Sequence, residues 1–123
     1  MNYITNLLTL QNQMRVFHWQ TQRKPGSFAQ HEAFGKAYDD LTENIDTFVE
    51  TYQGKYGVIL ANNGFNVTLH NLGNDPEEFV DEFVDYLTNV VPQGLEETDT
   101  DLLNIRDEML GILNQTKYRL HLI

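Results

Sequence analysis

The chain has 123 residues, with eight Lys and Arg against eighteen Asp and Glu and a formal charge of −10. This length predicts a single domain, covering residues 1–123, that buries a real core. The acidity and the absence of any basic run exclude an electrostatic basis for binding nucleic acid or an anionic membrane surface. Without cysteine, a predicted membrane span or a signal-peptide pattern, we expect a cytoplasmic protein that lacks disulfides and thiolate metal sites.

Four segments have the apolar spacing of amphipathic helices. The first ends before a break at Pro25 and Gly26, and the second follows a capping-box pattern at Ser27, with apolar residues recurring every seven positions. The third starts at Asp75-Pro76, and acidic residues around Asp99 predict N-capping of the fourth. The predicted helices cover about residues 2–21, 28–56, 76–91 and 99–121.

The connections between these helices differ in length. Short turns join the first helix to the second and the third to the fourth, which makes each pair antiparallel neighbours. The longer segment Val58–Asn74, with a short strand or helical turn predicted at Val67–His70, can cross the length of a bundle. The pattern predicts an all-α, ferritin-like four-helix bundle with a longer crossover between the second and third helices. An all-antiparallel bundle with an ordinary surface loop is the alternative.

Histidines and carboxylates at helical offsets are the candidate ligands. His18 ends the first helix and His31 begins the second, so the two can face each other across the turn. Asp46 and Glu50 are four residues apart on one helix face and can bind one cation together. His31 and Asp46, however, are separated by ~22 Å along the second helix. A shared site therefore needs two copies, with second helices antiparallel about a two-fold axis near Asp39, which creates two equal sites.

A stripe of acidic residues follows the second helix outside its apolar face. It is either solvated or turned toward a metal ion or another subunit. Additional ligands can come from this stripe, and a third interpretation places a metal site on Glu43, Asp46 and Glu50 within one bundle, with His18 dispensable. The stripe consists of Glu32, Asp39, Glu43, Asp46 and Glu50.

These residues resemble the pattern of the Dps mini-ferritins, cage-forming iron proteins of starved bacteria. The resemblance rests on His18-Trp19, on His31 and on the D-x-x-x-E motif Asp46–Glu50. It implies two-fold dimers, a dodecameric cage and an inter-subunit site that binds Fe(II), oxidises it with peroxide or oxygen, and stores Fe(III). The two histidines would be neutral nitrogen ligands and the two carboxylates oxygen ligands, with Trp19 as an aromatic neighbour. Such a donor set also suits Mn(II) or Zn(II), and its imidazoles would release metal below about pH 6.

The sequence departs from this pattern at Gly35, where the mini-ferritins have a ligand aspartate. Glycine within a helix indicates either close approach of another group to the backbone or a degenerate site. The second hypothesis is accordingly a non-enzymatic ferritin-like assembly or interaction protein, for example of a phage or virus. No long basic N-terminal tail is present, so we expect no direct DNA binding.

Overall fold

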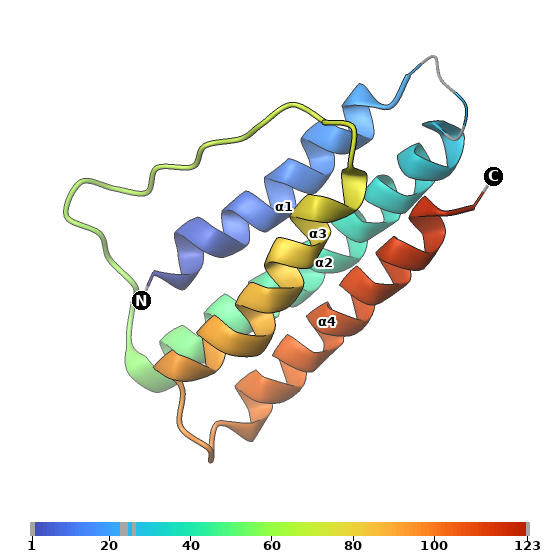
Figure 1. The fold of residues 1–123 in the computed structure, drawn as a ribbon. Helices are drawn as coiled ribbons and strands as arrows, with labels where there is room; N and C mark the ends of the chain where they lie inside the picture. The colour runs from blue at the N-terminus through green and yellow to red at the C-terminus, as the bar shows by residue number, and fades with distance from the viewer. Residues whose placement is uncertain (1, 23–24, 26, 123) are drawn as a thin grey trace.

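The structure is a computed structural model that describes residues 2–22, 25 and 27–122. Four α-helices form one unit (Figure 1), and no strand occurs among the residues described. The helices are α1 (Tyr3–Gln20), α2 (Ser27–Tyr56), α3 (Pro76–Asp85) and α4 (Thr100–Leu120). The predicted all-α, four-helix architecture is confirmed. Within the described ranges, no helix combines the length and apolarity that crossing a bilayer requires.

Side-chain contacts fix the relative directions of the helices. The Tyr3 ring of α1 lies 5.3 Å from the Phe48 ring near the end of α2, so these two helices are antiparallel. At the same end of α1, the Tyr3 hydroxyl donates to the Val91 carbonyl (2.7 Å), whereas Phe17 at the other end packs on Phe79 (5.5 Å between ring centroids). Helix α3 is therefore also antiparallel to α1. Consequently α2 and α3 run in the same direction, and the chain between them travels the length of the bundle (Figure 1).

The helix ends lie within one or two residues of their predicted positions, except in the third helix. Helix α2 begins at Ser27 itself, which is a helical residue and not the predicted cap. The third helix was predicted to continue to residue 91, but its α-helical part ends at Asp85. A wider π turn, η1 (Tyr86–Val90), and a 3-10 turn, η2 (Val91–Gly94), follow. Pro92 has no N–H to donate, so the α-helical ladder cannot continue through it.

The core lies between the inward faces of all four helices. Apolar residues at the predicted helical spacing fill it, and burial of each large side chain contributes about 1.5–3 kcal/mol. The largest of these fully buried side chains include Leu7, Leu10, Met14, Phe34, Leu41, Phe48, Leu87, Leu102, Met109 and Leu113. The acidic stripe of α2 lies on the opposite side of that helix, and all five of its residues are exposed. We call these five residues, Glu32, Asp39, Glu43, Asp46 and Glu50, the outer face of α2.

Two glutamines of α1 hold the crossover between α2 and α3. Gln13 is completely buried, and its amide donates to the His70 carbonyl (2.7 Å) and accepts from the His70 N–H (2.8 Å). Seven residues later, Gln20 accepts from the Leu72 N–H (2.7 Å) and donates to the Asn71 side chain (2.9 Å). The crossover is therefore fixed against α1 by side chains. The predicted strand or helical turn at Val67–His70 is wrong, because this segment has no regular secondary structure.

A buried carboxylate joins the end of α2 to the start of α4. Asp99 is 2% exposed and pairs with the Lys55 ammonium (2.5 Å), while it accepts hydrogen bonds from the Tyr56 hydroxyl (2.5 Å) and the Glu96 N–H (2.8 Å). The bonds from Lys55, then Tyr56, lower the pKa of Asp99 to about 2. Asp99 occupies the N-cap position of α4, but its side chain does not cap the helix as predicted. It connects helix ends instead.

Candidate functional site

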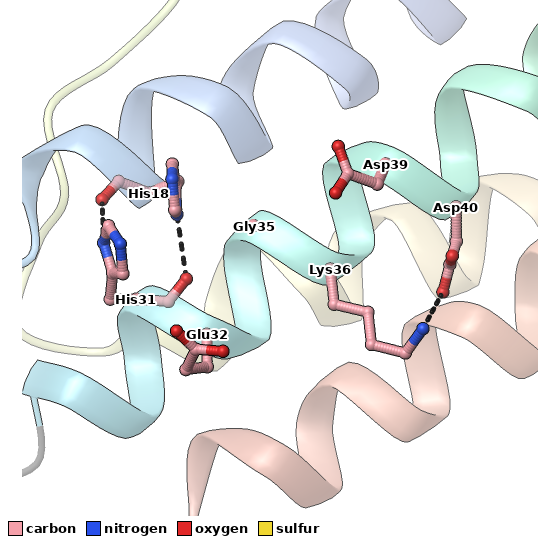
Figure 2. A pocket seen from close by; sticks show the side chains of 7 residues that line it. All are labelled: His18, His31, Glu32, Gly35, Lys36, Asp39 and Asp40. Atoms are coloured by element: carbon pink, nitrogen blue, oxygen red, sulfur yellow. Dashed lines mark hydrogen bonds and ion pairs between the residues drawn. The ribbon is translucent and has the colours of Figure 1, made fainter.

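His18, in the last turn of α1, and His31, near the start of α2, form a reciprocal pair (Figure 2). The Nδ1 of His18 donates to the His31 carbonyl oxygen (2.8 Å), and the Nδ1 of His31 donates to the His18 carbonyl oxygen (2.9 Å). Because a carbonyl only accepts, each Nδ1 carries a proton, and a neutral ring then has its lone pair on Nε2. Thr21 adds a bond from its hydroxyl to the His18 carbonyl (2.9 Å). We call the two imidazole–carbonyl bonds the histidine clasp.

The two imidazoles are also stacked, with ring centroids 3.8 Å apart and planes 23° apart. A metal ion binds imidazole at about 2 Å and in the plane of the ring. With the rings nearly parallel, an ion in the plane of one ring lies outside the plane of the other. The clasp therefore presents one imidazole to each ion, and a single ion can take both only if one ring leaves the stack.

The imidazole of His18 packs against the backbone of α2 at Gly35. A Cβ atom built at Gly35 would lie 2.8 Å from both Cε1 and Nδ1 of His18, closer than such contacts occur. The imidazole thus rests directly on the backbone of α2, where only glycine leaves room for it. The sequence left two explanations open for a glycine at this position of the helix. The structure supports close approach of another group to the backbone, because the His18 ring occupies the space that a side chain would need. A carboxylate side chain at this position would need space that the His18 ring occupies.

A surface pocket of about 370 Å³ opens beside the clasp. Charged residues of α2 share it with the imidazoles, and Figure 2 shows them along one side of that helix. Lys36 is paired with Asp40 at 3.1 Å, which places one cation next to the candidate ligands. The lining residues are His18, His31, Glu32, Gly35, Lys36, Asp39 and Asp40. Glu32 and Asp39, predicted as additional ligands, are therefore on the same pocket as the histidines.

Asp46 and Glu50 are exposed further along α2 and do not line this pocket. Across residues 2–22, 25 and 27–122 of one chain, no three His, Asp or Glu side chains come together closely enough to hold a metal ion. Glu43, Asp46 and Glu50 accordingly do not converge within the bundle. The structure brings together His18 and His31 and leaves the two predicted carboxylate ligands on the outer face of α2.

Trp19 lies beside the clasp and outside the core, with 62% of its surface exposed. The guanidinium carbon of Arg15 is 5.5 Å from the Trp19 ring centroid and 4.7 Å from that of Tyr38, within cation–π range. These three side chains line a second pocket together with His18, Gly35 and Asp39. The sequence analysis missed Arg15 and Tyr38. Arg15 was recognisable as the single Lys or Arg of the first helix, placed four residues before Trp19.

Comparison with known proteins places the chain in a family without assigning an activity. No curated protein and no solved structure matches it. One family model, described as a family of unknown function (DUF5856), matches residues 18–120, from the first histidine of the clasp to the last residue of α4. Because this match covers most of the chain, the protein belongs to the family of unknown function DUF5856.

Proposed function

We propose that this chain is a ferritin-like protein that binds Fe(II) at a site shared by two copies. His18 and His31 of one copy supply nitrogen ligands, one of them after its ring has left the stack, and Asp46 and Glu50 of the other copy supply oxygen ligands. The histidine clasp carries this proposal, because a ring whose Nδ1–H is held by a backbone carbonyl is oriented for metal binding through Nε2. Peroxide or oxygen would accept the electron that Fe(II) loses, and the Fe(III) product would be stored.

The course of the chain supports the ferritin-like part of the proposal. Among four-helix bundles, one long crossover connection is the ferritin-like arrangement. Helices α2 and α3 run in the same direction (Figure 1). The side chains of Gln13 and Gln20 hold the crossover between them against α1. A bundle of this kind provides a long outer helix, α2, on which two copies can pair about a two-fold axis. Such dimers would assemble further into a dodecameric cage in the cytoplasm.

The chemistry of the proposed ligands limits the choice of metal ion. Imidazole and carboxylate together suit Fe(II), Mn(II) and Zn(II) better than Mg(II) or Ca(II), which prefer oxygen ligands. Trp19 would lie beside the bound metal, since it flanks His18 in the second pocket. Glu32 and Asp39, which line the clasp pocket, are available to supplement the ligands or to hold water on the metal.

A second candidate function is favoured because the contacts of the histidine clasp explain both histidines as structural residues. Both Nδ1 atoms bond to backbone, the rings stack, and Gly35 accommodates His18, so the pair links α1 to α2 without any metal. On this hypothesis the chain is a ferritin-like assembly or interaction protein, and its histidines are structural. The outer carboxylates Asp46 and Glu50 would then be solvated.

Metal binding by matched variants distinguishes the two functions. We expect Zn(II) to bind the wild type in titration calorimetry, and His18→Asn and Glu50→Gln each to weaken binding more than about tenfold. Asparagine retains an N–H in place of Nδ1, which preserves the bond to the His31 carbonyl while removing Nε2. Glu97→Gln, at an exposed position of the α3–α4 connection, is the charge-matched control. Equal affinities in all four proteins would overturn the shared site and favour the assembly protein.

Iron storage is tested separately. Purified protein is mixed with Fe(II) in air and passed over a sizing column with light scattering, and iron is counted per chain in the eluting peak. A cage-sized peak that carries many irons per chain is the expected result. A small species without iron would overturn storage.

A further inference from the structure

Arg15 of α1 lies against two aromatic rings and has no acidic partner in the described part of the chain. Its guanidinium carbon is 4.7 Å from the centroid of the Tyr38 ring and 5.5 Å from that of the Trp19 ring. No carboxylate oxygen of the described residues lies within 4 Å of its nitrogens. Other Lys and Arg side chains do pair with carboxylates; they are Lys36, Lys55, Arg106 and Lys117. In a chain with eighteen Asp and Glu, this arginine is thus oriented by aromatic rings and not by a carboxylate.

The guanidinium of Arg15 is suited to binding an oxyanion from outside the chain. It is planar, always charged, and carries five N–H donors in a fork that matches the two oxygens of a carboxylate. Attraction to the Trp19 and Tyr38 rings acts on its positive charge and uses none of these donors. Because the rings also limit its rotamers, less conformational freedom is lost when a ligand binds. Arg15 therefore presents a preorganised carboxylate-binding group.

The surroundings of Arg15 form a pocket of the size that small molecules occupy. Its volume is about 320 Å³, near the lower end of the usual range of about 300–1,000 Å³. Trp19 has 62% of its surface exposed, which leaves ring surface for stacking against an aromatic ligand. The pocket thus combines a carboxylate-binding cation with aromatic walls. Its lining residues are Arg15, His18, Trp19, Gly35, Tyr38 and Asp39.

A negative side chain in the same pocket limits the charge of the ligand. Asp39 lines the pocket and is exposed, so it repels anions, and the whole chain has a formal charge of −10. A ligand with several negative charges, such as a phosphate ester or a dicarboxylate, would place excess charge near Asp39. A single carboxylate directed at Arg15, on a neutral body, avoids most of this repulsion. The balance of charges therefore favours a monocarboxylate.

We propose that this pocket binds a small aromatic monocarboxylate, whose carboxylate accepts hydrogen bonds from Arg15 and whose ring stacks on Trp19. The proposal goes beyond the shared metal site and requires neither a metal ion nor a second copy. A ligand in this pocket would lie beside the histidine clasp, because His18, Gly35 and Asp39 line both pockets.

Trp19 is the single tryptophan of the chain, so its fluorescence reports directly on this pocket. Benzoate is titrated into the full chain in EDTA at constant ionic strength, and three further probes are compared with it. Acetate keeps the carboxylate without the ring, benzamide keeps the ring without the charge, and benzylamine reverses the charge. We expect saturable binding of benzoate with a Kd on the order of 1 mM, typical of a ligand this small. The other three should bind at least about tenfold more weakly, because each loses the stacking contact or the bond to Arg15.

Two results with these probes would overturn the proposal. Acetate bound as tightly as benzoate would indicate nonspecific attraction of anions to Arg15. Benzylamine bound more tightly than benzoate would indicate that Trp19 and Tyr38 form a cage for cations, from which Arg15 is displaced.

Substitutions that leave Trp19 in place identify the residues responsible. We expect Arg15→Gln to weaken benzoate binding at least about tenfold, and Arg15→Lys to weaken it by less, since lysine keeps the charge but not the fork. Asp39→Asn should strengthen binding, because it removes the repelling charge. Arg119→Gln is the control, since it removes the same charge from a different pocket and should bind benzoate as the wild type does. Wild-type affinity in Arg15→Gln, or an equal loss in Arg119→Gln, would overturn the proposal.

Loss of Arg15 also changes the surroundings of Trp19, so a second measurement that does not depend on fluorescence is made. Line broadening of the benzoate ring protons in NMR gives the fraction of ligand bound by each variant, and circular dichroism checks that each variant is folded. A wild type that binds Zn(II) but not benzoate would overturn the carboxylate pocket and leave the shared metal site standing. Benzoate binding by a wild type that binds no Zn(II) would have the opposite meaning.

Discussion

At the scale of single residues, two glycines of α2 that look alike in the sequence have different physical roles. Gly35 supports the imidazole of His18, whereas a Cβ at Gly54 would meet nothing within 4 Å. Both lie within a helix, where glycine is less favourable than alanine by about 1 kcal/mol. Replacement by alanine should therefore have opposite effects at the two positions.

We expect Gly35→Ala to destabilise the fold by about 1–3 kcal/mol, the usual cost of overpacking, because the new methyl group displaces His18 and breaks the clasp. Gly54→Ala should instead stabilise it by up to about 1 kcal/mol through helix propensity alone. Urea unfolding at neutral pH gives both free energies. A Gly35→Ala protein as stable as Gly54→Ala would mean that the His18 ring is free to move away.

The sequence was sufficient to place His18 and His31 on either side of one turn, because two helices and a short turn leave little choice. Their stacking and reciprocal bonds were not predictable, since these depend on side-chain rotamers and on how deeply His18 sits on Gly35. The cation–π contacts of Arg15 depend on rotamers in the same way. Spacing alone thus identifies which residues meet, but not the orientation of their donor atoms.

At the scale of elements, the positions of the helices were predictable because apolar residues at helical spacing indicate which side of each helix is buried. The end of α3 was not, because apolar residues keep helical spacing up to Val91 although the backbone changes to π and 3-10 turns after Asp85. The path of the crossover between α2 and α3 was also not predictable from the sequence. It depends on Gln13, a polar residue completely buried within an otherwise apolar face. The pair Gln13 and Gln20, seven residues apart, was the available signal for it.

Loss of the Gln13 amide should loosen the crossover. In Gln13→Ala the His70 N–H and carbonyl lose their partners, and we expect the free energy of unfolding to fall by about 1–3 kcal/mol. Hydrogen exchange of the His70 amide should accelerate, and proteases should cut within residues 57–72 while the helices remain intact. Asn12→Ala, which removes a side-chain amide from the adjacent position, is the control. Unchanged exchange at His70 would show that another contact holds the crossover.

The link between α2 and α4 through Asp99 should make stability depend on pH in acid. The pKa of Asp99 is lowered in the folded chain to about 2, from an ordinary value near 4. Its ionised form thus stabilises the fold above about pH 4, and this contribution is lost as the pH falls through about 2. We expect Asp99→Asn to have a lower Tm than the wild type at pH 6, with the difference narrowing between pH 4 and pH 2. A constant difference across this range, or the same narrowing in Glu97→Gln, would contradict the assignment.

At the scale of the whole molecule, the lengths of three connections predicted the topology. Two short turns set the antiparallel pairs, and one long connection allowed α2 and α3 to run in the same direction. The arrangement of copies depends on the surfaces of two chains and does not follow from these lengths. Asp46 and Glu50 are exposed and do not line the clasp pocket, so a metal ion bound by these carboxylates and by the histidines needs a second copy.

A shared site predicts that two defective variants complement each other. His18→Asn retains the carboxylates and Glu50→Gln retains the histidines, so a dimer containing one chain of each has one intact site of two. After mixing and refolding, we expect roughly a quarter of the wild-type Zn(II) content, since half of the dimers are mixed. Zinc is measured in the dimer peak by atomic emission, with each variant refolded alone as the control. A mixture that binds no more than its components would rule out a site built from two chains.

The pairing of Gln13 with His70 has a further consequence, for the order in which the chain folds. Most contacts of α1 with α2, and of α3 with α4, are between segments joined by short turns, which close quickly. The bonds from Gln13 join residues 57 positions apart and close a much longer loop than either short turn, so we expect them to form late in folding. Contacts made so late have little influence on the folding rate and act mainly by slowing unfolding. A single buried amide would thus lengthen the lifetime of the native state more than it hastens its formation.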